Sequence, residues 1–458
     1  MTNPHIFREY DVRGIVARDL AGEVPLQLGR AFGSAVVARP GTAGRHRVVV
    51  GRDNRPSSNG LAAALIEGVL ATGADVIDIG TVPTPVLYYA AARLRTDGAV
   101  QITGSHNPAE YNGFKMLVEN RAMWGPAIQD LRRRIDTTDF ASGKGALSQQ
   151  TVLPVYVDDL ASRFHVNRPL RVVVDCGNGT GSLIAEDLLR RTGASVVPLF
   201  CESDGTFPNH HPDPTVDENL EDLIERVRAE RADLGIAFDG DADRLGAVDE
   251  RGNIVRGDML LLLFGLDVLE RRGRPQKLIF DVKCSRAVAE VFSRHGGEPI
   301  MWKTGHSLIK EKMKETGALI AGELSGHICF GEDYYGFDDA LYGACALLQL
   351  VARSDRSLSS RIAEFPQYVS TPEIRVDVDE ESKFEIVREA VEEFGRTHDV
   401  IAVDGARVSF DGGWGLMRAS NTQPAIVLRF EADSEERLAA IRSEVEEWLQ
   451  ERGVSVGS

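Results

Sequence analysis

The sequence predicts an α/β protein with three related mixed α/β domains followed by a C-terminal α+β domain. Its 458 residues exceed what one hydrophobic core supports, so two to four domains are expected. Short apolar runs alternate with helical patterns in the same order three times, which predicts parallel strands joined by right-handed crossovers. We place the domain boundaries at 1–150, 151–253, 254–365 and 366–458.

The elements of the repeat can be read in chain order. The first copy has strands at 45–51, 75–80 and 98–102, with helices at 57–73, capped by Ser57 or Ser58, and at 85–94. The second copy has strands at 170–175, 195–200 and 234–238, with helices at 183–191 and 218–231. The third has strands at 277–282, 299–302 and 318–322, with helices at 285–295 and 306–316.

The C-terminal part departs from this repeat. The proline-containing segment "EFPQYVSTP" at 364–372 is expected to be a linker. After it come a strand, a helix at 380–396, strands around 403–410 and 425–432, and a last helix at 434–452. This order is typical of an α+β domain.

Composition excludes several classes of function. Apolar content of 43% and charged content of 26% are typical of a soluble globular protein. A net charge of −17 argues against nucleic-acid and anionic-membrane partners. No signal-peptide core or run of roughly 18 apolar residues is present, and five scattered cysteines fit a reducing compartment. We therefore expect a cytoplasmic protein.

Each copy of the repeat ends in a polar loop directly after its third strand. These loops are "TGSHNP" at 103–108, "DGDADR" at 239–244 and "GELSGH" at 322–327. Because ligands bind beyond the carboxyl ends of parallel strands, the three loops are expected to share one cleft. The alternative is three unrelated polar turns. A glycine-rich stretch at 175–181, "DCGNGTG", resembles a phosphate cradle only weakly, and we favour a tight turn there.

The loop at 239–244 carries three alternating carboxylates, on Asp239, Asp241 and Asp243. Carboxylates held together repel one another unless a cation neutralises them. All-oxygen ligands select a hard ion, and Mg²⁺ leaves positions free for water or phosphate oxygens. The alternative is a solvated acidic turn. The position of the loop directly after an apolar strand favours a metal site.

The hydroxyl of Ser105 could cap a helix, act in a catalytic triad or carry a phosphate. A triad would need His106 as the base, but adjacent side chains are expected to point apart, and no G-x-S-x-G turn is present. With a divalent metal nearby, a phosphoserine bound to that metal is the simplest interpretation. Lys115 and Arg244 could then contact the remaining phosphate oxygens.

Two further loops offer groups for a sugar phosphate. Glu323 and Ser325 are acceptors spaced for neighbouring sugar hydroxyls. A fourth polar loop, "RASNTQP" at 418–424, supplies phosphate donors at Arg418, Ser420, Asn421 and Thr422. Either loop alone would fit a turn or a cap equally well. Together they indicate a ligand with a sugar at one end and a phosphate at the other.

These four ordered motifs resemble the α-D-phosphohexomutase superfamily, and within it the bacterial phosphomannomutase/phosphoglucomutase group. The resemblance covers essentially the whole chain. It implies four domains in a heart-shaped arrangement around one cleft, which the last domain closes. It also implies that the active site contains Tyr10 and Arg13 of "YDVRG", Lys115 of "YNGFK", Lys283 of "DVKCS", His306 of "WKTGHS" and His327 of "GELSGH".

The resemblance implies an isomerase that interconverts the 1- and 6-phosphates of glucose and mannose through phosphorylated Ser105 and a hexose 1,6-bisphosphate. Mg²⁺ is the implied cofactor, bound by Asp239, Asp241, Asp243 and Ser105. The expected catalytic residues are Ser105, Arg13, Lys115, Arg244 and His306. The expected substrate-binding residues are Tyr10, Lys283, Glu323, Ser325, His327, Arg418, Ser420, Asn421 and Thr422. We expect a monomer.

Two departures from the family pattern bear on this interpretation. Ala242 stands where many relatives have glycine, which restricts the backbone but leaves the aspartates in place. Leu324 stands where phosphoglucosamine mutases typically have glutamine, and together with "GFDDALYGA" at 336–344 it favours the mannose/glucose group. A phosphoglucosamine mutase is the first alternative. A non-catalytic sugar-phosphate sensor is the second, and the intact motifs argue against it.

Overall fold

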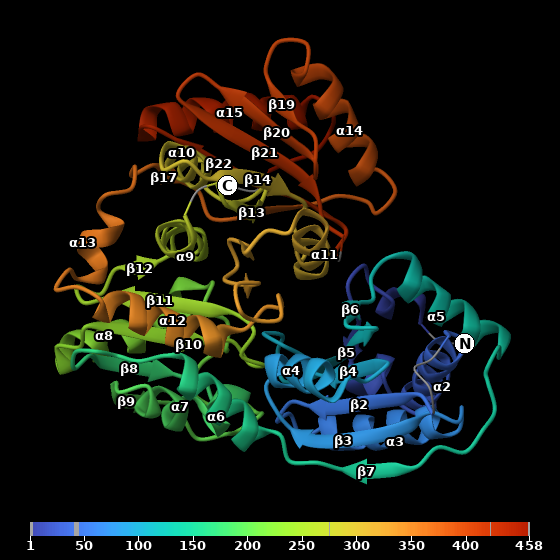
Figure 1. The fold of residues 1–458 in the computed structure, drawn as a ribbon. Helices are drawn as coiled ribbons and strands as arrows, with labels where there is room; N and C mark the ends of the chain where they lie inside the picture. Colours follow the sequence, from blue (N-terminus) through green and yellow to red (C-terminus); the bar gives the residue numbers. More distant parts are fainter. Residues whose placement is uncertain (1–2, 41–44, 274, 422, 457–458) are drawn as a thin grey trace.

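The computed structural model describes residues 3–40, 45–273, 275–421 and 423–456. Four β-sheets, each formed by a separate stretch of the chain, lie in chain order around the middle of the molecule (Figure 1). The first three sheets carry helices on their faces, as parallel crossovers require. Among the described residues, no helix is long and apolar enough to cross a membrane.

Domain I holds a seven-stranded sheet. Its elements are η1 Pro4–Ile6, β1 Val12–Ile15, α1 Val16–Asp19, α2 Val24–Val37, β2 Arg47–Arg52, α3 Ser58–Leu70, β3 Asp75–Thr81, α4 Thr84–Leu94, β4 Gly98–Ile102, β5 Tyr111–Val118, β6 Arg121–Ala122, α5 Pro126–Thr137 and β7 Leu147–Gln149. A cluster of buried apolar side chains from α2, α3 and α5 packs against this sheet.

Domains II and III have smaller sheets. Domain II contains α6 Leu153–Arg163, β8 Arg171–Asp175, η2 Thr180–Leu183, α7 Ala185–Arg191, β9 Ser195–Leu199, η3 Asp217–Leu220, α8 Glu221–Glu230, β10 Leu234–Phe238, β11 Leu245–Asp249 and β12 Ile254–Val255. Domain III contains α9 Gly257–Arg272, β13 Lys277–Asp281, α10 Arg286–Arg294, β14 Glu298–Trp302, α11 His306–Thr316, β15 Ile320–Gly322, β16 Ile328–Phe330, α12 Ala340–Ala352 and α13 Leu358–Ile362. One large apolar core spans both domains and reaches α4 of domain I.

The three sheets share one pairing scheme, which confirms the repeat. In each, the first strand lies between the second and the third and is parallel to both: β2 with β3 and β4, β8 with β9 and β10, and β13 with β14 and β15. The third strand then pairs with an antiparallel fourth: β4 with β5, β10 with β11 and β15 with β16. The sequence did not predict these fourth strands. Each polar loop therefore joins a parallel strand to an antiparallel one at the sheet's carboxyl edge.

Domain IV is an antiparallel sheet covered by two helices. Its elements are β17 Val369–Ser370, β18 Ile374–Asp377, α14 Lys383–Phe394, β19 Val400–Ile401, β20 Ala406–Phe410, β21 Gly413–Ala419, β22 Ala425–Ala432 and α15 Glu435–Gln450. Apolar side chains of α14 and α15 pack on the sheet, whereas Trp414 and Leu416 contact Val282 of domain III. The C-terminal domain is thus attached to domain III through its sheet.

Two local predictions have different outcomes. Ser57 stands at the N-cap position of α3, as one of the two predicted residues, but its hydroxyl makes no capping bond. The Ser58 hydroxyl donates to Asp53 instead. The glycine-rich stretch at 175–181 is a turn, as predicted: Gly177 and Asn178 have φ of 49° and 58°, and a 3-10 helix follows.

Candidate active site

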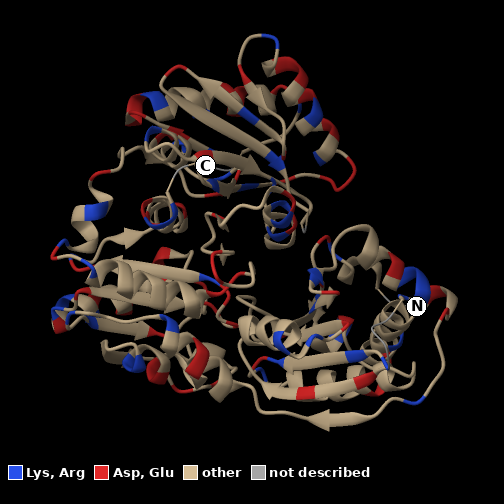
Figure 2. Cartoon of the chain, viewed as in Figure 1, with Lys and Arg blue, Asp and Glu red and all other residues tan. Residues whose placement is uncertain are grey.

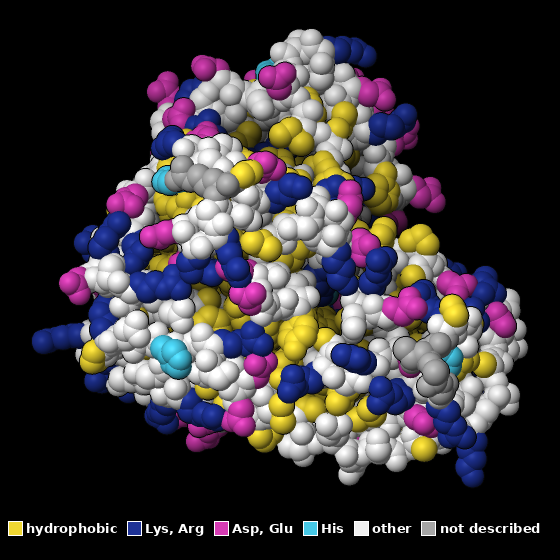
Figure 3. Space-filling view, viewed as in Figure 1, with side chains coloured by type: hydrophobic (Ala, Val, Ile, Leu, Met, Phe, Trp, Pro, Cys, Tyr) yellow, Lys and Arg dark blue, Asp and Glu magenta, His cyan; other side chains and the backbone are white. Residues whose placement is uncertain are grey.

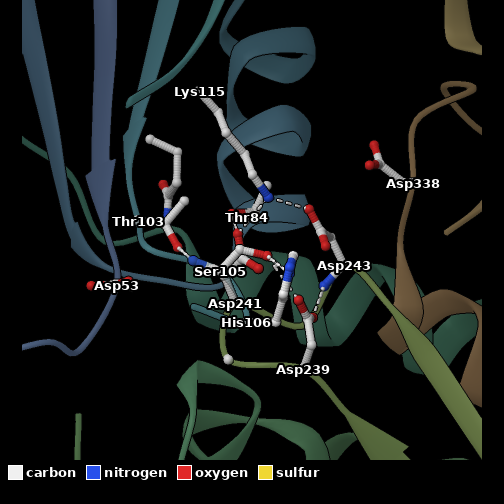
Figure 4. Close-up of polar contacts among 12 residues, drawn as sticks. Asp53, Thr84, Thr103, Ser105, His106, Lys115, Asp239, Asp241, Asp243 and Asp338 are labelled. Atoms are coloured by element: carbon white, nitrogen blue, oxygen red, sulfur yellow. Dashed lines mark hydrogen bonds and ion pairs between the residues drawn. The ribbon is translucent and has the colours of Figure 1, made fainter. Parts of the chain in front are cut away.

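Ser105 lies at the end of β4, in the loop that leads to β5. Its side chain is buried, and its Oγ donates to Asp239 Oδ2 at 3.0 Å. Its backbone has a φ of 49°, a left-handed conformation that is unfavourable for most residues other than glycine. The Thr103 hydroxyl accepts the Ser105 N–H at 2.8 Å. This backbone turn aims the hydroxyl at the aspartates of domain II (Figure 4).

The expectation that His106 points away from Ser105 is wrong. The left-handed turn at Ser105 brings His106 Nδ1 to 3.2 Å from Ser105 Oγ. Burial lowers the pKa of His106 well below its usual value, and the charges of Arg244, Arg13 and Lys115 lower it further. His106 is therefore a neutral hydrogen-bonding partner of the serine.

The carboxylates of Asp239, Asp241 and Asp243 are fully buried, and one oxygen from each lies within 4.8 Å of the others. Burial, reinforced by the two neighbouring aspartates, raises the pKa of Asp239 well above its usual value. Among the described residues, Asp241 Oδ1 and Asp243 Oδ1 have no hydrogen-bond partner. His327 Nδ1 lies 3.5 Å from Asp243 Oδ1. Buried carboxylate oxygens that lie this close together without hydrogen-bond partners fit a hard divalent cation. Ala242 has a φ of 58°, which explains why glycine suits its position.

Lys115 and Thr84 contact the same carboxylates from domain I. Lys115 Nζ lies 2.7 Å from Asp241 Oδ2 and 2.5 Å from Asp243 Oδ2. Burial opposes the lysine's charge, but the three aspartates outweigh it and raise its pKa. The Thr84 hydroxyl donates to Asp241 Oδ2 at 2.5 Å. Domain I therefore supplies both the serine and part of the charge balance.

The loop of domain III meets the loop of domain II. An isolated β-bridge joins Arg244 to His327, and Arg244 Nε donates to His327 Nε2 at 3.1 Å. Glu323 Oε1 accepts the Gly305 N–H at 2.5 Å, and burial raises the pKa of Glu323. Ser325 lies half-buried in the same turn.

A second cluster surrounds His306, the first residue of α11. Asp338 Oδ2 lies 3.0 Å from His306 Nδ1 and 3.2 Å from His327 Nδ1, while Lys310 Nζ donates to Asp338 Oδ1 at 2.7 Å. Burial, with the charge of Lys310, lowers the pKa of His306 to about 4. His306 is therefore uncharged at neutral pH. Asp338 and Lys310 were not predicted, although Lys310 lies one helical turn after His306.

The fourth loop reaches the centre through Tyr10 and Asp404. Asn421 Nδ2 donates to Tyr10 Oη at 2.8 Å, and Tyr10 Oη donates to the Thr304 carbonyl at 2.8 Å. Arg418 Nε donates to Asp404 Oδ2 at 2.6 Å.

The remaining predicted residues have separate contacts. Ser420 Oγ accepts the Gln423 N–H, whereas Thr422 lies outside the described residues. Arg13 donates to Asp11 and to Asn107 of the Ser105 loop. Lys283 Nζ donates to Glu373 at the start of domain IV, at 2.6 Å. The Arg13 contact joins the Ser105 loop to β1 within domain I, and the Lys283 contact joins domain III to domain IV.

Charge is distributed unevenly over the molecule. Acidic segments lie on the loops in the middle of the view in Figure 2, whereas the outer helices carry both signs. On the face seen in Figure 3, basic and acidic side chains are interspersed, with hydrophobic side chains visible among them.

A serine beside three buried carboxylates, with lysine and arginine side chains around it, is an arrangement typical of a phosphoryl-transfer site. The chain matches four family models: phosphoglucomutase/phosphomannomutase α/β/α domain I at residues 4–142, domain II at 154–252, domain III at 256–368 and the C-terminal domain at 373–447. The chain belongs to the phosphoglucomutase/phosphomannomutase family, an isomerase family, as the motifs had indicated.

Named relatives agree with this assignment. The chain is 50% identical over 440 residues to a phosphomannomutase/phosphoglucomutase of Pseudomonas aeruginosa, covering 96% of this chain and 94% of the relative. It is 44% identical over 443 residues to a phosphoglucomutase of Neisseria gonorrhoeae, covering 96% and 95%. A solved family member from Burkholderia thailandensis superposes with a TM-score of 0.91 at 42% identity, covering 98% of each chain.

Proposed function

We propose that the protein reversibly interconverts the 1- and 6-phosphates of glucose and mannose, through phosphorylated Ser105 and a hexose 1,6-bisphosphate. The observation that carries this proposal is the Ser105 hydroxyl 3.0 Å from Asp239, within a buried carboxylate triad. The names of the relatives support the two sugars.

The reaction begins with the transfer of a phosphoryl group from Ser105. The bond between phosphorus and the serine oxygen breaks, a new bond forms to the free sugar hydroxyl, and the hydroxyl proton leaves to a base. Asp239, Asp241 and Asp243, with an oxygen at Ser105, would hold one Mg²⁺, which when bound would neutralise charge on the departing phosphoryl group. The reverse transfer from the other end of the turned bisphosphate restores phosphorylated Ser105.

The cationic groups around the serine and the imidazole of His306 assist this transfer. Lys115, Arg244 and Arg13 neutralise charge on the phosphoryl oxygens. His306 is neutral and held at Nδ1 by Asp338, so its other ring nitrogen can accept the hydroxyl proton.

The intermediate has to present both of its ends to Ser105 in turn. Glu323 and Ser325 accept hydrogen bonds from ring hydroxyls in either orientation. The phosphate that is not reacting is bound by Arg418, Ser420, Asn421 and Thr422. Tyr10, Lys283 and His327 are further substrate-binding residues. Because one chain supplies all four loops, we propose a monomer. Its five free cysteines fit the cytoplasm.

The test is a direct assay with glucose, mannose and glucosamine 1-phosphates, using protein whose Ser105 phosphorylation has been measured by intact mass. Glucose and mannose 1-phosphates should both be turned over, and glucosamine 1-phosphate should be a poor substrate. Preferential turnover of glucosamine 1-phosphate would identify the phosphoglucosamine alternative. Binding of all three to phosphorylated protein without turnover would leave only the sensor.

A further inference from the structure

The segment between β2 and α3 lies beneath the Ser105 loop. The N–H of Asp53 donates to the carbonyl of Ile102, the last residue of β4, at 2.8 Å. This contact continues the parallel pairing of β2 and β4 beyond the sheet. Two charged side chains of the segment, Asp53 and Arg55, are completely buried there. Neither belongs to the motifs that identified the site.

All five N–H donors of the Arg55 guanidinium form hydrogen bonds to this loop or to Asp53. Its Nη2 donates to the carbonyls of Ser105 at 2.8 Å and Asn107 at 2.5 Å. Its Nη1 donates to the carbonyls of Pro108 at 2.6 Å and Tyr111 at 3.2 Å, and its Nε donates to Asp53 Oδ2 at 3.1 Å. One planar guanidinium therefore holds four carbonyls of the Ser105 loop in fixed relative positions.

Asp53 completes the clamp from the other side. Its Oδ2 also accepts the Gly104 N–H at 3.0 Å, and its Oδ1 accepts the Arg55 N–H at 3.0 Å and the Ser58 hydroxyl. The loop fits closely against the guanidinium, because a Cβ at Gly104 would lie 2.5 Å from Arg55 Cζ. Asp53 lies beside the loop, opposite the carboxylates of domain II (Figure 4).

The loop needs such a clamp because Ser105 is in a left-handed conformation that its own backbone disfavours. The carbonyl of Ser105 is one of the four that Arg55 binds, so the clamp acts on the reacting residue itself.

Domain II covers the clamp as well. The Phe207 ring centroid lies 4.9 Å from Arg55 Cζ, and Asn54 Nδ2 donates to the Asn178 carbonyl at 2.8 Å. The same segment thus contacts the domain that supplies the aspartates.

We propose that Arg55, oriented by Asp53, is a positioning residue that fixes the Ser105 loop in the conformation required for phosphoryl transfer. This inference rests on the proposed role of Ser105 as the phosphoryl carrier. Lysine cannot replace Arg55, because its three donors radiate from one atom and cannot reach four spread carbonyls.

The experiment compares Arg55→Lys with Arg52→Lys as the matched control. Arg52 ends β2 and binds Asn59 and Asp78 rather than the Ser105 loop. Arg55→Lys should lower kcat about 100-fold, the cost of roughly 1 Å of misplacement, and leave KM for glucose 1-phosphate within about threefold. The rate at which glucose 1,6-bisphosphate phosphorylates Ser105, followed by intact mass, should fall by a similar factor. Arg52→Lys should leave both rates unchanged.

A merely structural role gives a different result. Arg55→Lys would then lower activity only in proportion to its folded fraction, with a normal rate of Ser105 phosphorylation per folded molecule. That result, or wild-type kcat, would overturn the inference. If Arg55→Lys does not fold, Asp53→Asn replaces it in the test, and the same two quantities are measured: kcat and the rate of Ser105 phosphorylation. Ser105→Ala is measured in parallel: normal turnover there refutes the carrier, whereas an inactive Ser105→Ala beside a fully active Arg55→Lys refutes only the clamp.

Discussion

The two ends of the active site are held very differently. At the reacting end, Ser105, Lys115 and the aspartates are fully buried and in direct contact across domains I and II. At the proposed gripping end, Glu323, Arg418 and Ser420 are buried as well, but Ser325 and Asn421 are half-buried. The loop of domain IV reaches domain I through the hydroxyl of Tyr10. Chemistry at a fixed phosphorus atom needs rigid geometry, whereas a bisphosphate that must turn needs a grip that releases.

The largest loss of activity is expected from a substitution at the reacting end. Ser105→Ala removes the proposed carrier, so turnover of glucose 1-phosphate should fall to less than about one-thousandth. Intact mass should show one phosphate on the wild type and none on the variant. Ser148→Ala, an exposed serine on β7 of the same domain, is the control. Near-normal turnover by Ser105→Ala would end the phosphoserine mechanism.

Removing the metal should be nearly as severe. Excess chelator should abolish turnover and added Mg²⁺ should restore it, because three buried carboxylates would otherwise repel one another. Asp239→Asn, Asp241→Asn and Asp243→Asn should each weaken Mg²⁺ binding by at least the roughly 10-fold seen when an outer partner of a metal site is lost. Asp204→Asn, on an exposed loop of domain II, serves as the control. Full activity in chelator would contradict the assignment.

The next effect concerns pH and His306, which lies between the two ends. Burial lowers its pKa from 6.5 to about 4, so the unfolded chain binds a proton there before the folded one does. Stability should be complete above pH 6.5 and fall by on the order of 3 kcal/mol as pH drops to 4. Urea unfolding at several pH values should show a smaller drop for His306→Asn than for the wild type. The exposed His295→Asn should behave like the wild type, and an unchanged pH dependence in His306→Asn would contradict this expectation.

The gripping end is expected to discriminate sugars modestly. Glucose and mannose differ only at C2, which no motif residue is assigned to contact, so their 1-phosphates should have similar kcat/KM. Galactose inverts C4 and would leave one acceptor of Glu323 or Ser325 unpaired, at a cost of about 1–3 kcal/mol. Its 1-phosphate should therefore be about 10- to 100-fold poorer. Equal kcat/KM for galactose and glucose 1-phosphates would show that these two residues do not contact the ring as proposed.

The smallest effect is expected from loosening domain IV. Tyr10→Phe removes the hydroxyl that joins Asn421 to the Thr304 carbonyl, a net loss of about 1 kcal/mol, or roughly fivefold. KM for glucose 1-phosphate should rise by about that factor, with kcat nearly unchanged. Small-angle scattering should show wild-type protein contracting on saturation with sugar phosphate, and the variant more expanded without it. Tyr335→Phe, a partly exposed tyrosine, is the control. Identical scattering with and without ligand would argue against hinge closure.

Sequence patterns predicted the repeat because its first three strands are short, mostly apolar runs that alternate with helical patterns. They missed β5 because it carries the polar residues Asn112 and Lys115 inward, and β16 because it is only three residues long. The division of the chain at residues 150, 253 and 365 stays a prediction.

The candidate site could be predicted where the residue types themselves indicate the chemistry. The serine, aspartate and glutamate residues in the strand-end loops are such residues. His106 did not, because its contact depends on the left-handed turn at Ser105, a backbone property. Asp53 and Arg55 belong to none of the motifs, and only the fold shows that "GRDNRPSS" lies at the same sheet edge as "TGSHNP".

The attachment of domain IV has a consequence for how long the protein works without interruption. In the proposed mechanism, each forward transfer leaves Ser105 without a phosphate while the sugar carries both. A domain that opens far enough for the sugar to turn also lets some of it escape, and every escape strands the protein in an inert form. The protein then depends on hexose bisphosphate from its surroundings to be primed again. In this mechanism, the number of cycles between primings is set by how fast the sugar turns and reacts at the serine relative to how often an opening of domain IV releases it.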